Sequence, residues 1–167
     1  TEMIGNSSAI LTVRKTIEKV APTNSRVLMM GGSGVGKELA AREIHRASKR
    51  ATGPFLVLHC KSDSEDSLEK RLFGAEASQS APRKLGMLEQ AHGGSLYLDE
   101  VTELPLDVQS KLVRFLHEQS FKRVGGDQKV IADVRIFAGS QKDIKQQIEE
   151  GLFREDLYFR LNVITLH

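Results

Sequence analysis

Short runs of apolar residues, bounded by glycine, proline or charged residues, punctuate the chain. They lie at 26–30, 55–58, 95–98 and 134–138, and a last run lies at 162–166. Within each run the apolar positions are nearly continuous, which is typical of strands that are buried on both faces. Because helix-like segments separate the runs, the pattern predicts an α/β fold with a parallel sheet sandwiched by helices.

Apolar residues recur at helical spacing between these strands. Val13, Ile17 and Val20 share one face of a segment that begins near residue 8, and a second such segment opens at Pro105. Further helices are predicted from the glycine-rich stretch to about residue 48, and over 62–72, 87–91, 142–149 and 154–160. The turn at 125–128 predicts a small β-hairpin over 121–131, whereas 75–85 has no clear period and is expected to be a loop.

Length and composition describe an ordinary single domain. The 167 residues suffice for a proper core, and 40% of them are hydrophobic. No stretch approaches the ~20 apolar residues of a membrane span, and no secretory signal opens the chain. Cys60 is the only cysteine, which excludes an internal disulfide and agrees with a cytoplasmic location. The net charge of +2 is too balanced to indicate nucleic-acid binding by itself.

A glycine-rich octet, 31–38, follows the first apolar run and precedes a predicted helix. Its sequence, GGSGVGKE, fits the phosphate-loop pattern G-x-x-x-x-G-K up to the last position, where Glu38 replaces the Ser or Thr that would bind Mg²⁺. The glycines allow backbone N–H groups to close on phosphate oxygens, and Lys37 would add a charge for the β and γ phosphates. The alternative is a glycine-rich turn with a surface lysine.

The third apolar run ends in Asp99 and Glu100, about sixty residues after the glycine-rich octet. Asp99 would lie at the carboxyl end of its strand, where open α/β sheets bind ligands, and would hold Mg²⁺ through its water shell. Glu100 would polarise the attacking water. Two acidic residues at a strand end are by themselves more often solvent-exposed residues where the chain leaves the sheet, but together with the octet they predict ATP or GTP binding.

The chain resembles the AAA+ domain of the NtrC-like bacterial enhancer-binding proteins, which act on sigma-54 RNA polymerase. The similarity rests on the runs GGSGVGKELAAREIH, GPFLVLHC, LEQAHGGSLYLDEVTELPLDVQSKLVRFLHE, DVRIFAGSQKDI and GLFREDLYFRLNV. It implies a five-stranded parallel sheet, Mg²⁺ and ATP as ligands, and assembly into a hexameric ring. It also implies that Glu38 is usual after the lysine.

The resemblance assigns roles to individual residues. Those implied to bind nucleotide are Gly5, Gly31, Gly32, Ser33, Gly34, Val35, Gly36, Lys37, Glu38 and Leu39. Those implied to take part in hydrolysis are Asp99, Glu100, Ser140, Gln141, His59, Arg154 and Arg160. Arg154 and Arg160 match arginine fingers that reach the nucleotide of a neighbouring subunit, whereas without the resemblance they would be read as part of a solvated helix beside Glu155 and Asp156.

Four departures from the family pattern stand out. Gly32 and Val35 alter the usual GESGTGKE loop, His59 stands where an asparagine restrains the catalytic glutamate, and Ser140-Gln141 replaces the usual Thr-Asn sensor pair. The loop that should carry GAFTGA, the element that touches sigma-54, reads AEASQSAPRKLG and is shorter. NtrX-like response regulators also lack that motif, and the chain is most similar to them.

Two functions remain open at this point. The first is the ATPase module of a two-component transcription regulator, with residues 1–167 as its α/β subdomain and a helical lid, receiver and DNA-binding domains expected outside it. The second is a nucleotide-sensing assembly module with negligible hydrolysis. In either case we expect self-association in a ring, with a monomer or dimer possible for the fragment. Contact with DNA or RNA polymerase is expected only through the full-length protein, with no membrane involved.

Overall fold

The computed structural model describes residues 8–32, 34–61 and 67–166. Its centre is a five-stranded sheet in the order β2–β3–β6–β1–β7, and every neighbouring pair is parallel. The strands are β1 (Val27–Met30), β2 (Phe55–His59), β3 (Ser95–Asp99), β6 (Arg135–Ser140) and β7 (Ile164–Leu166). The predicted five-stranded parallel sheet is therefore confirmed.

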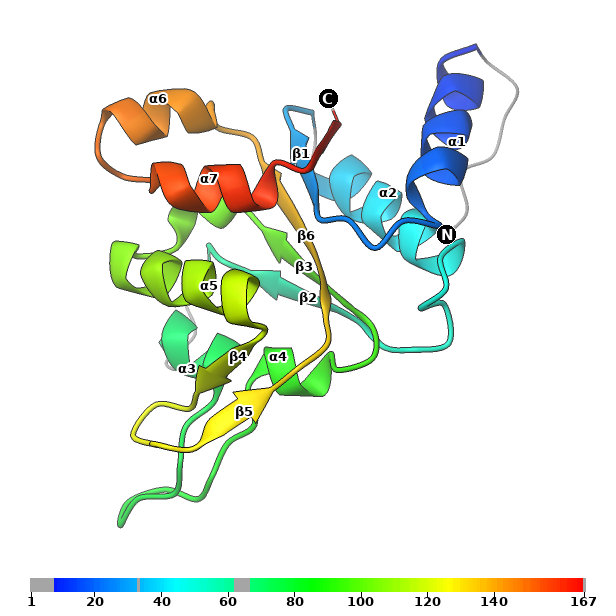
Figure 1. Cartoon of the computed structure of the whole chain (residues 1–167). Coiled ribbons are helices and arrows are strands. Elements are labelled where there is room, and N and C mark those ends of the chain that lie inside the picture. The colour runs from blue at the N-terminus through cyan, green and yellow to red at the C-terminus, as the bar shows by residue number, and fades with distance from the viewer. Residues whose placement is uncertain (1–7, 33, 62–66, 167) are drawn as a thin grey trace.

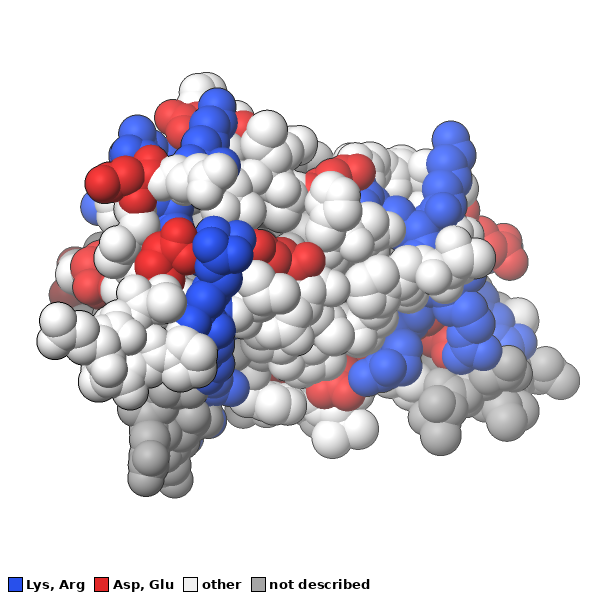
Figure 2. Space-filling view, turned by 90° about the horizontal axis from the view of Figure 1, so that it is seen from below, with Lys and Arg blue, Asp and Glu red and all other residues white. Residues whose placement is uncertain are grey.

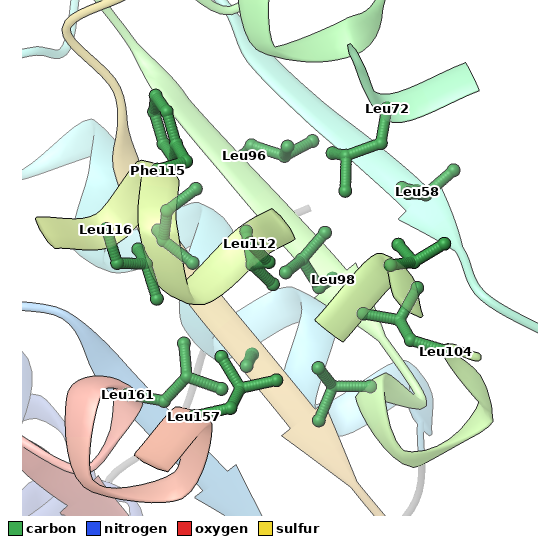
Figure 3. Close-up of a cluster of buried hydrophobic side chains, with 14 of the residues drawn as sticks. Leu58, Leu72, Leu96, Leu98, Leu104, Leu112, Phe115, Leu116, Leu157 and Leu161 are labelled. Atoms are coloured by element: carbon green, nitrogen blue, oxygen red, sulfur yellow. The ribbon is translucent and has the colours of Figure 1, made fainter. Parts of the chain in front are cut away.

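Helices cover both faces of this sheet, as Figure 1 shows. On one face lie α1 (Ser8–Val20) and α2 (Gly34–Arg46); the other helices are α3 (Leu68–Phe73), α4 (Met87–Gln90), α5 (Leu106–Glu118), α6 (Ile144–Glu149) and α7 (Glu155–Leu161). Successive residues of a strand point to opposite faces, and each face has its own core. Met29 and Tyr97 pack with α1 and α2, whereas Leu28, Leu96 and Leu98 pack with the helices of the other face. Figure 3 shows this second core, in which leucines of β3 and α5 meet those of α7.

The predicted hairpin is present as β4 (Ser120–Lys122) paired with β5 (Lys129–Ile131). Beside it lies the loop 75–85, the long green excursion at the bottom of Figure 1. Its base is closed, because the backbone N–H of Ala75 donates to Lys84 (2.9 Å) and that of Lys84 donates back to Ala75 (2.9 Å). Ala75 also bridges to Val124 after β4, so the loop and the hairpin share one base.

Some predicted boundaries were wrong or are untested. The second helix ends at Arg46 rather than near residue 48, and of the predicted helix 62–72 only α3 is described, since 62–66 lie outside the described residues. A 3₁₀ turn, η1 (Val101–Glu103), was not predicted. In the described part of the chain no helix is long and apolar enough to cross a membrane.

Candidate functional site

Three adjacent strands bring the predicted site together at their carboxyl ends. In the order β3–β6–β1, Asp99 ends the first strand and Ser140 the second, and Gly31 follows the third. The backbone N–H of Gly31 donates to the carbonyl oxygen of Ser140 (2.9 Å), which ties the glycine loop to the sensor strand. The edge of the sheet predicted to bind the ligand is therefore where these residues meet.

The glycine loop has the backbone that its sequence predicted. Gly31 and Gly32 have φ of 74° and 65°, in the left-handed region that glycine adopts at little cost. The helix α2 then begins at Gly34, so the N-terminus of this helix lies at the same edge of the sheet. Gly5 and Ser33, both predicted to bind nucleotide, lie outside the described residues.

Not every predicted loop side chain faces the site. Val35 is 82% exposed. Glu38 forms an ion pair with Arg42, one turn further along α2 (3.2 Å), and Leu39 is half-buried. Any contribution of Val35, Glu38 and Leu39 to ligand binding is therefore expected to come from the backbone or from van der Waals contact.

Lys37 is the unusual side chain of the loop. It is 6% exposed, and its Nζ has no hydrogen-bond partner among the described residues. The nearest carboxylate oxygen is Oε1 of Glu100, 3.9 Å away, too long for a hydrogen bond. A buried ammonium without hydrogen bonds is costly, and an anionic ligand at this edge would supply the missing acceptors.

Asp99 offers a second unpartnered polar atom. Its Oδ1 is buried without a hydrogen-bond partner in the described structure, while its Oδ2 lies 2.9 Å from Nδ1 of His59. A Cβ placed on Gly34 would lie 3.8 Å from that Oδ1, so the free oxygen faces the glycine loop. This arrangement fits a divalent cation that takes one protein oxygen and its other ligands from phosphate and water. Among the described residues no group of three or more His, Cys, Asp or Glu could hold a metal alone.

Glu100 adopts a left-handed backbone (φ 55°, ψ 60°) and turns the chain from β3 into η1. Its Oε1 accepts a hydrogen bond from the backbone N–H of Gln141 (3.1 Å), the second predicted sensor residue. The side-chain amide of Gln141 also reaches the glycine loop, since its Nε2 lies 3.9 Å from the Cβ position of Gly34. Glu100 and Gln141 therefore close the site opposite Lys37.

Two predicted hydrolysis residues have other partners than expected. His59 was predicted from the resemblance to restrain the catalytic glutamate, but its hydrogen bond goes to Asp99 because the β2–β3 register places the two side by side. Ser140 is fully buried, and its hydroxyl donates to the carbonyl oxygen of Lys142 (2.9 Å). In this structure Ser140 therefore stabilises the turn after β6 rather than facing the glycine loop.

Arg154 directly precedes α7 and Arg160 lies within it, and neither makes a polar contact with Lys37, Asp99 or Glu100 in the described chain. The guanidinium of Arg154 forms two hydrogen bonds with Asp156, both 2.9 Å, and this pair raises the pKa of Arg154 and lowers the pKa of Asp156. The side chain of Arg160 is exposed. Within one chain the arrangement agrees with the solvated-helix alternative, and any contact with nucleotide would have to come from a neighbouring copy.

Gln109 is a residue of this region that the sequence reading missed. It is fully buried on α5, and its side-chain oxygen accepts the backbone N–H of Arg154 (2.8 Å). A signal was present, because position 109 lies on the apolar face that Val108 and Leu112 define. A polar residue on such a face needs buried hydrogen-bond partners.

Comparison with known proteins gives a consistent picture. The profile of the family described as "Sigma-54 interaction domain" matches residues 3–167. The nitrogen assimilation regulatory protein NtrX of Azorhizobium caulinodans is 47% identical over 164 residues, which cover 98% of this chain and 36% of that protein. The predicted likeness to NtrX-like regulators is confirmed, and the chain spans about a third of the length of such relatives.

Solved structures agree. NtrX from Brucella abortus in complex with ATP has a TM-score of 0.91 and 47% identity, over 99% of this chain and 36% of that one. The P-loop NTPase domain of the sigma-54 transport activator from E. coli (TM-score 0.64, 19% identity, covering 98% of this chain and 96% of that chain) shares the fold. Because the family profile and a relative at 47% identity each span nearly all of the chain, this chain belongs to the Sigma-54 interaction domain family.

Proposed function

We propose that the chain binds ATP with Mg²⁺ at the carboxyl edge of its sheet and hydrolyses it as the AAA+ module of a cytoplasmic two-component transcription regulator. One observation carries the proposal: among the described residues, neither the buried ammonium of Lys37, in the glycine loop, nor the buried Oδ1 of Asp99, which faces that loop, has a hydrogen-bond partner. A cation bridged to phosphate would satisfy both atoms. The ATP complex of the Brucella abortus NtrX supports the same ligand for this chain.

Each residue has a distinct task in this proposal. Lys37 binds the β and γ phosphates, and the N–H groups at the start of α2 bind the remaining phosphate oxygens. Asp99, held by His59, keeps its free oxygen toward the metal's water shell. Glu100 takes the proton of the attacking water, and the backbone N–H of Gln141 fixes the orientation of its carboxylate. Asp99 would hold Mg²⁺ through its free oxygen, and the ion would supply positive charge to offset the charge that develops on the transferred phosphoryl group.

Hydrolysis in this proposal requires a second copy of the chain. Arg154 and Arg160 make no polar contact with the site in the described chain, so they act on the nucleotide of a neighbour in an assembled ring. Turnover per subunit should therefore rise with protein concentration, and Arg154→Ala and Arg160→Ala should each abolish that rise while leaving ATP affinity unchanged. Arg114→Ala is the matched control, since Arg114 on α5 is also an exposed arginine and its ion pair in the described structure is with Glu118.

The alternative is nucleotide sensing without appreciable hydrolysis, and the altered His59 and Gln141 favour it. ATP would then drive assembly, measured by sedimentation, while steady-state turnover stays at background at every concentration. In both cases DNA and RNA polymerase are contacted only through the whole protein. On the face shown in Figure 2, acidic side chains lie among the basic ones, so this face presents no uniformly basic surface to a nucleic acid.

We also propose that the whole protein does not open sigma-54 promoters. Loop 75–85 contains no aromatic residue, and an exposed aromatic would supply most of the energy at so small a contact. The loop is also held at its base, where the guanidinium of Arg123 contacts Glu76 (3.4 Å) and Glu89 (2.8 Å). The protein would act with another sigma factor or as a repressor.

The test mixes sigma-54 with the protein trapped by an ATP transition-state mimic. No stable complex is expected, and grafting GAFTGA into the loop should restore capture if the loop is the only defect. Capture by the unaltered protein, at the level of a relative that carries GAFTGA, would refute the proposal.

A further inference from the structure

Gln109 uses both ends of its amide inside the core. Its Nε2 donates to the carbonyl oxygens of Leu104 (2.8 Å) and Leu152 (3.0 Å), and its Oε1 accepts the backbone N–H of Arg154 (2.8 Å). The side chain is 0% exposed. Both amide hydrogens and the amide oxygen are therefore engaged with backbone groups of two separate segments.

The first of these segments leads directly from the site. Glu100 begins η1, where the N–H of Glu103 donates to the carbonyl oxygen of Glu100 (3.0 Å) and that of Leu104 donates to Val101 (3.2 Å). Leu104, whose carbonyl Gln109 holds, is thus connected to Glu100 by one tight turn. A shift of Glu100 would move this turn and, through Gln109, the start of α7.

The second segment carries Arg154. This residue precedes the first turn of α7, and its own side chain makes no capping hydrogen bond. The hydrogen bond from its N–H to Gln109 fixes where α7 begins. At the other end of α7, Arg26 donates to the carbonyl oxygens of Arg160 (3.2 Å) and Leu116 (2.6 Å) and joins the C-terminal ends of α7 and α5.

We propose that Gln109 is a positioning residue that couples the Glu100 turn to Arg154. The inference rests on the proposed function, in which Arg154 reaches the nucleotide of a neighbouring copy. Gln109 itself touches neither nucleotide nor metal; it fixes the position and direction of the Arg154 backbone just before α7. Arg26 fixes the opposite end, so that α7 moves with α5 as one unit.

The experiment is a double-mutant cycle between Gln109→Met and Arg154→Ala, measured by steady-state ATPase of the intact protein. Methionine keeps the length and volume of glutamine but removes its donors and acceptor. Displacing a catalytic group by about 1 Å lowers a reaction rate on the order of 100-fold. Gln109→Met, which removes the hydrogen bond that positions Arg154, should therefore lower kcat at least tenfold and leave the Kd for ATP within twofold of that of the unaltered protein. In the Arg154→Ala background the same change should lower kcat less than twofold. Gln90→Met, at the end of α4, is the control, because it loses one hydrogen bond to the carbonyl oxygen of Leu85.

The outcomes separate cleanly. If the fall in kcat of the double variant equals the product of the falls in the two single variants, Gln109 acts independently of Arg154 and the inference is wrong. If Arg154→Ala leaves turnover unchanged, the assignment of Arg154 fails and the inference fails with it. If ATP does not bind to the unaltered protein, the proposed function itself fails. If ATP binds without turnover, the same four proteins are compared by ATP-dependent assembly in sedimentation. Loss of the Gln109→Met effect in the Arg154→Ala background would support the inference, and independent effects of the two substitutions would contradict it.

A second measurement does not depend on a folded variant. Hydrogen exchange by NMR in the unaltered protein should show the Arg154 amide strongly protected, because its N–H is bonded to a fully buried side chain. The amides of Glu155 and Asp156, in the first turn of α7, serve as internal references. If the Arg154 amide exchanges as fast as the amides of Glu155 and Asp156, Gln109 does not fix the start of α7 and the proposal is contradicted.

Discussion

Replacing Glu100 by glutamine separates ATP binding from turnover in this site. The carboxylate lies 3.9 Å from the Lys37 ammonium and accepts the N–H of Gln141 at 3.1 Å. Glutamine keeps the size and an oxygen for Gln141 but cannot take a proton. Loss of a general base typically costs 10²- to 10⁴-fold, so turnover should fall by about that factor.

The affinity for ATP should rise in Glu100→Gln, whereas turnover falls. At an effective dielectric constant of about 20, a unit charge 3.9 Å from Lys37 contributes roughly 4 kcal/mol of gross attraction, most of it offset by desolvation. Without that carboxylate the Lys37 ammonium is left buried and unpaired in the free protein, and the phosphates meet one negative charge less. The Glu100→Gln protein should therefore have a lower Tm without ligand, and ATP should raise its Tm by more than it raises that of the unaltered protein.

The assay combines calorimetric titration with ATP, thermal unfolding with and without ATP, and phosphate release. Glu103→Gln is the matched control, since it is the same substitution three residues away, and the ion pair that it affects in the described structure is with Lys142 (3.3 Å). If Glu100→Gln hydrolyses ATP as fast as the unaltered protein, Glu100 is not the base. If ATP binding is lost, the carboxylate has a binding role that this reasoning excludes.

Two further predictions concern stability. A Cβ on Gly139 would overlap the hydroxyl oxygen of Tyr97 and lie 3.0 Å from its Cζ, so Gly139→Ala should cost about 1–3 kcal/mol in urea unfolding. Tyr97→Phe, which removes a buried hydroxyl that has no hydrogen-bond partner in the described part of the chain, should recover most of that loss. Strictly additive effects of the two substitutions would contradict the overlap of Tyr97 with residue 139. His45 is held between Ser95 and Gly53, and burial lowers its pKa. The unfolded chain then binds a proton near pH 6.5 that the folded chain does not, so stability should decrease below about pH 6.5, and less so in His45→Gln.

The sheet could be predicted because its strands are apolar at nearly every position and two clear motifs follow two of them. The glycine loop and the Asp99–Glu100 pair are local patterns, and the structure brings them together as expected. The partner of His59 was not predictable, because it depends on the register between β2 and β3. The role of Gln109 depends on packing between α5 and the start of α7, more than forty residues apart in sequence.

In the proposed function, the Lys37 ammonium and Oδ1 of Asp99 have no hydrogen-bond partner among the described residues because they bind ATP and Mg²⁺. Isothermal calorimetry of the unaltered protein, Lys37→Ala and the control Lys145→Ala, on the exposed side of α6, tests it most directly. A charge-assisted contact of about 1.5–3 kcal/mol predicts a Kd that is roughly 10- to 150-fold weaker for Lys37→Ala and unchanged for Lys145→Ala. Equal ATP affinity of the unaltered protein and Lys37→Ala would contradict the account.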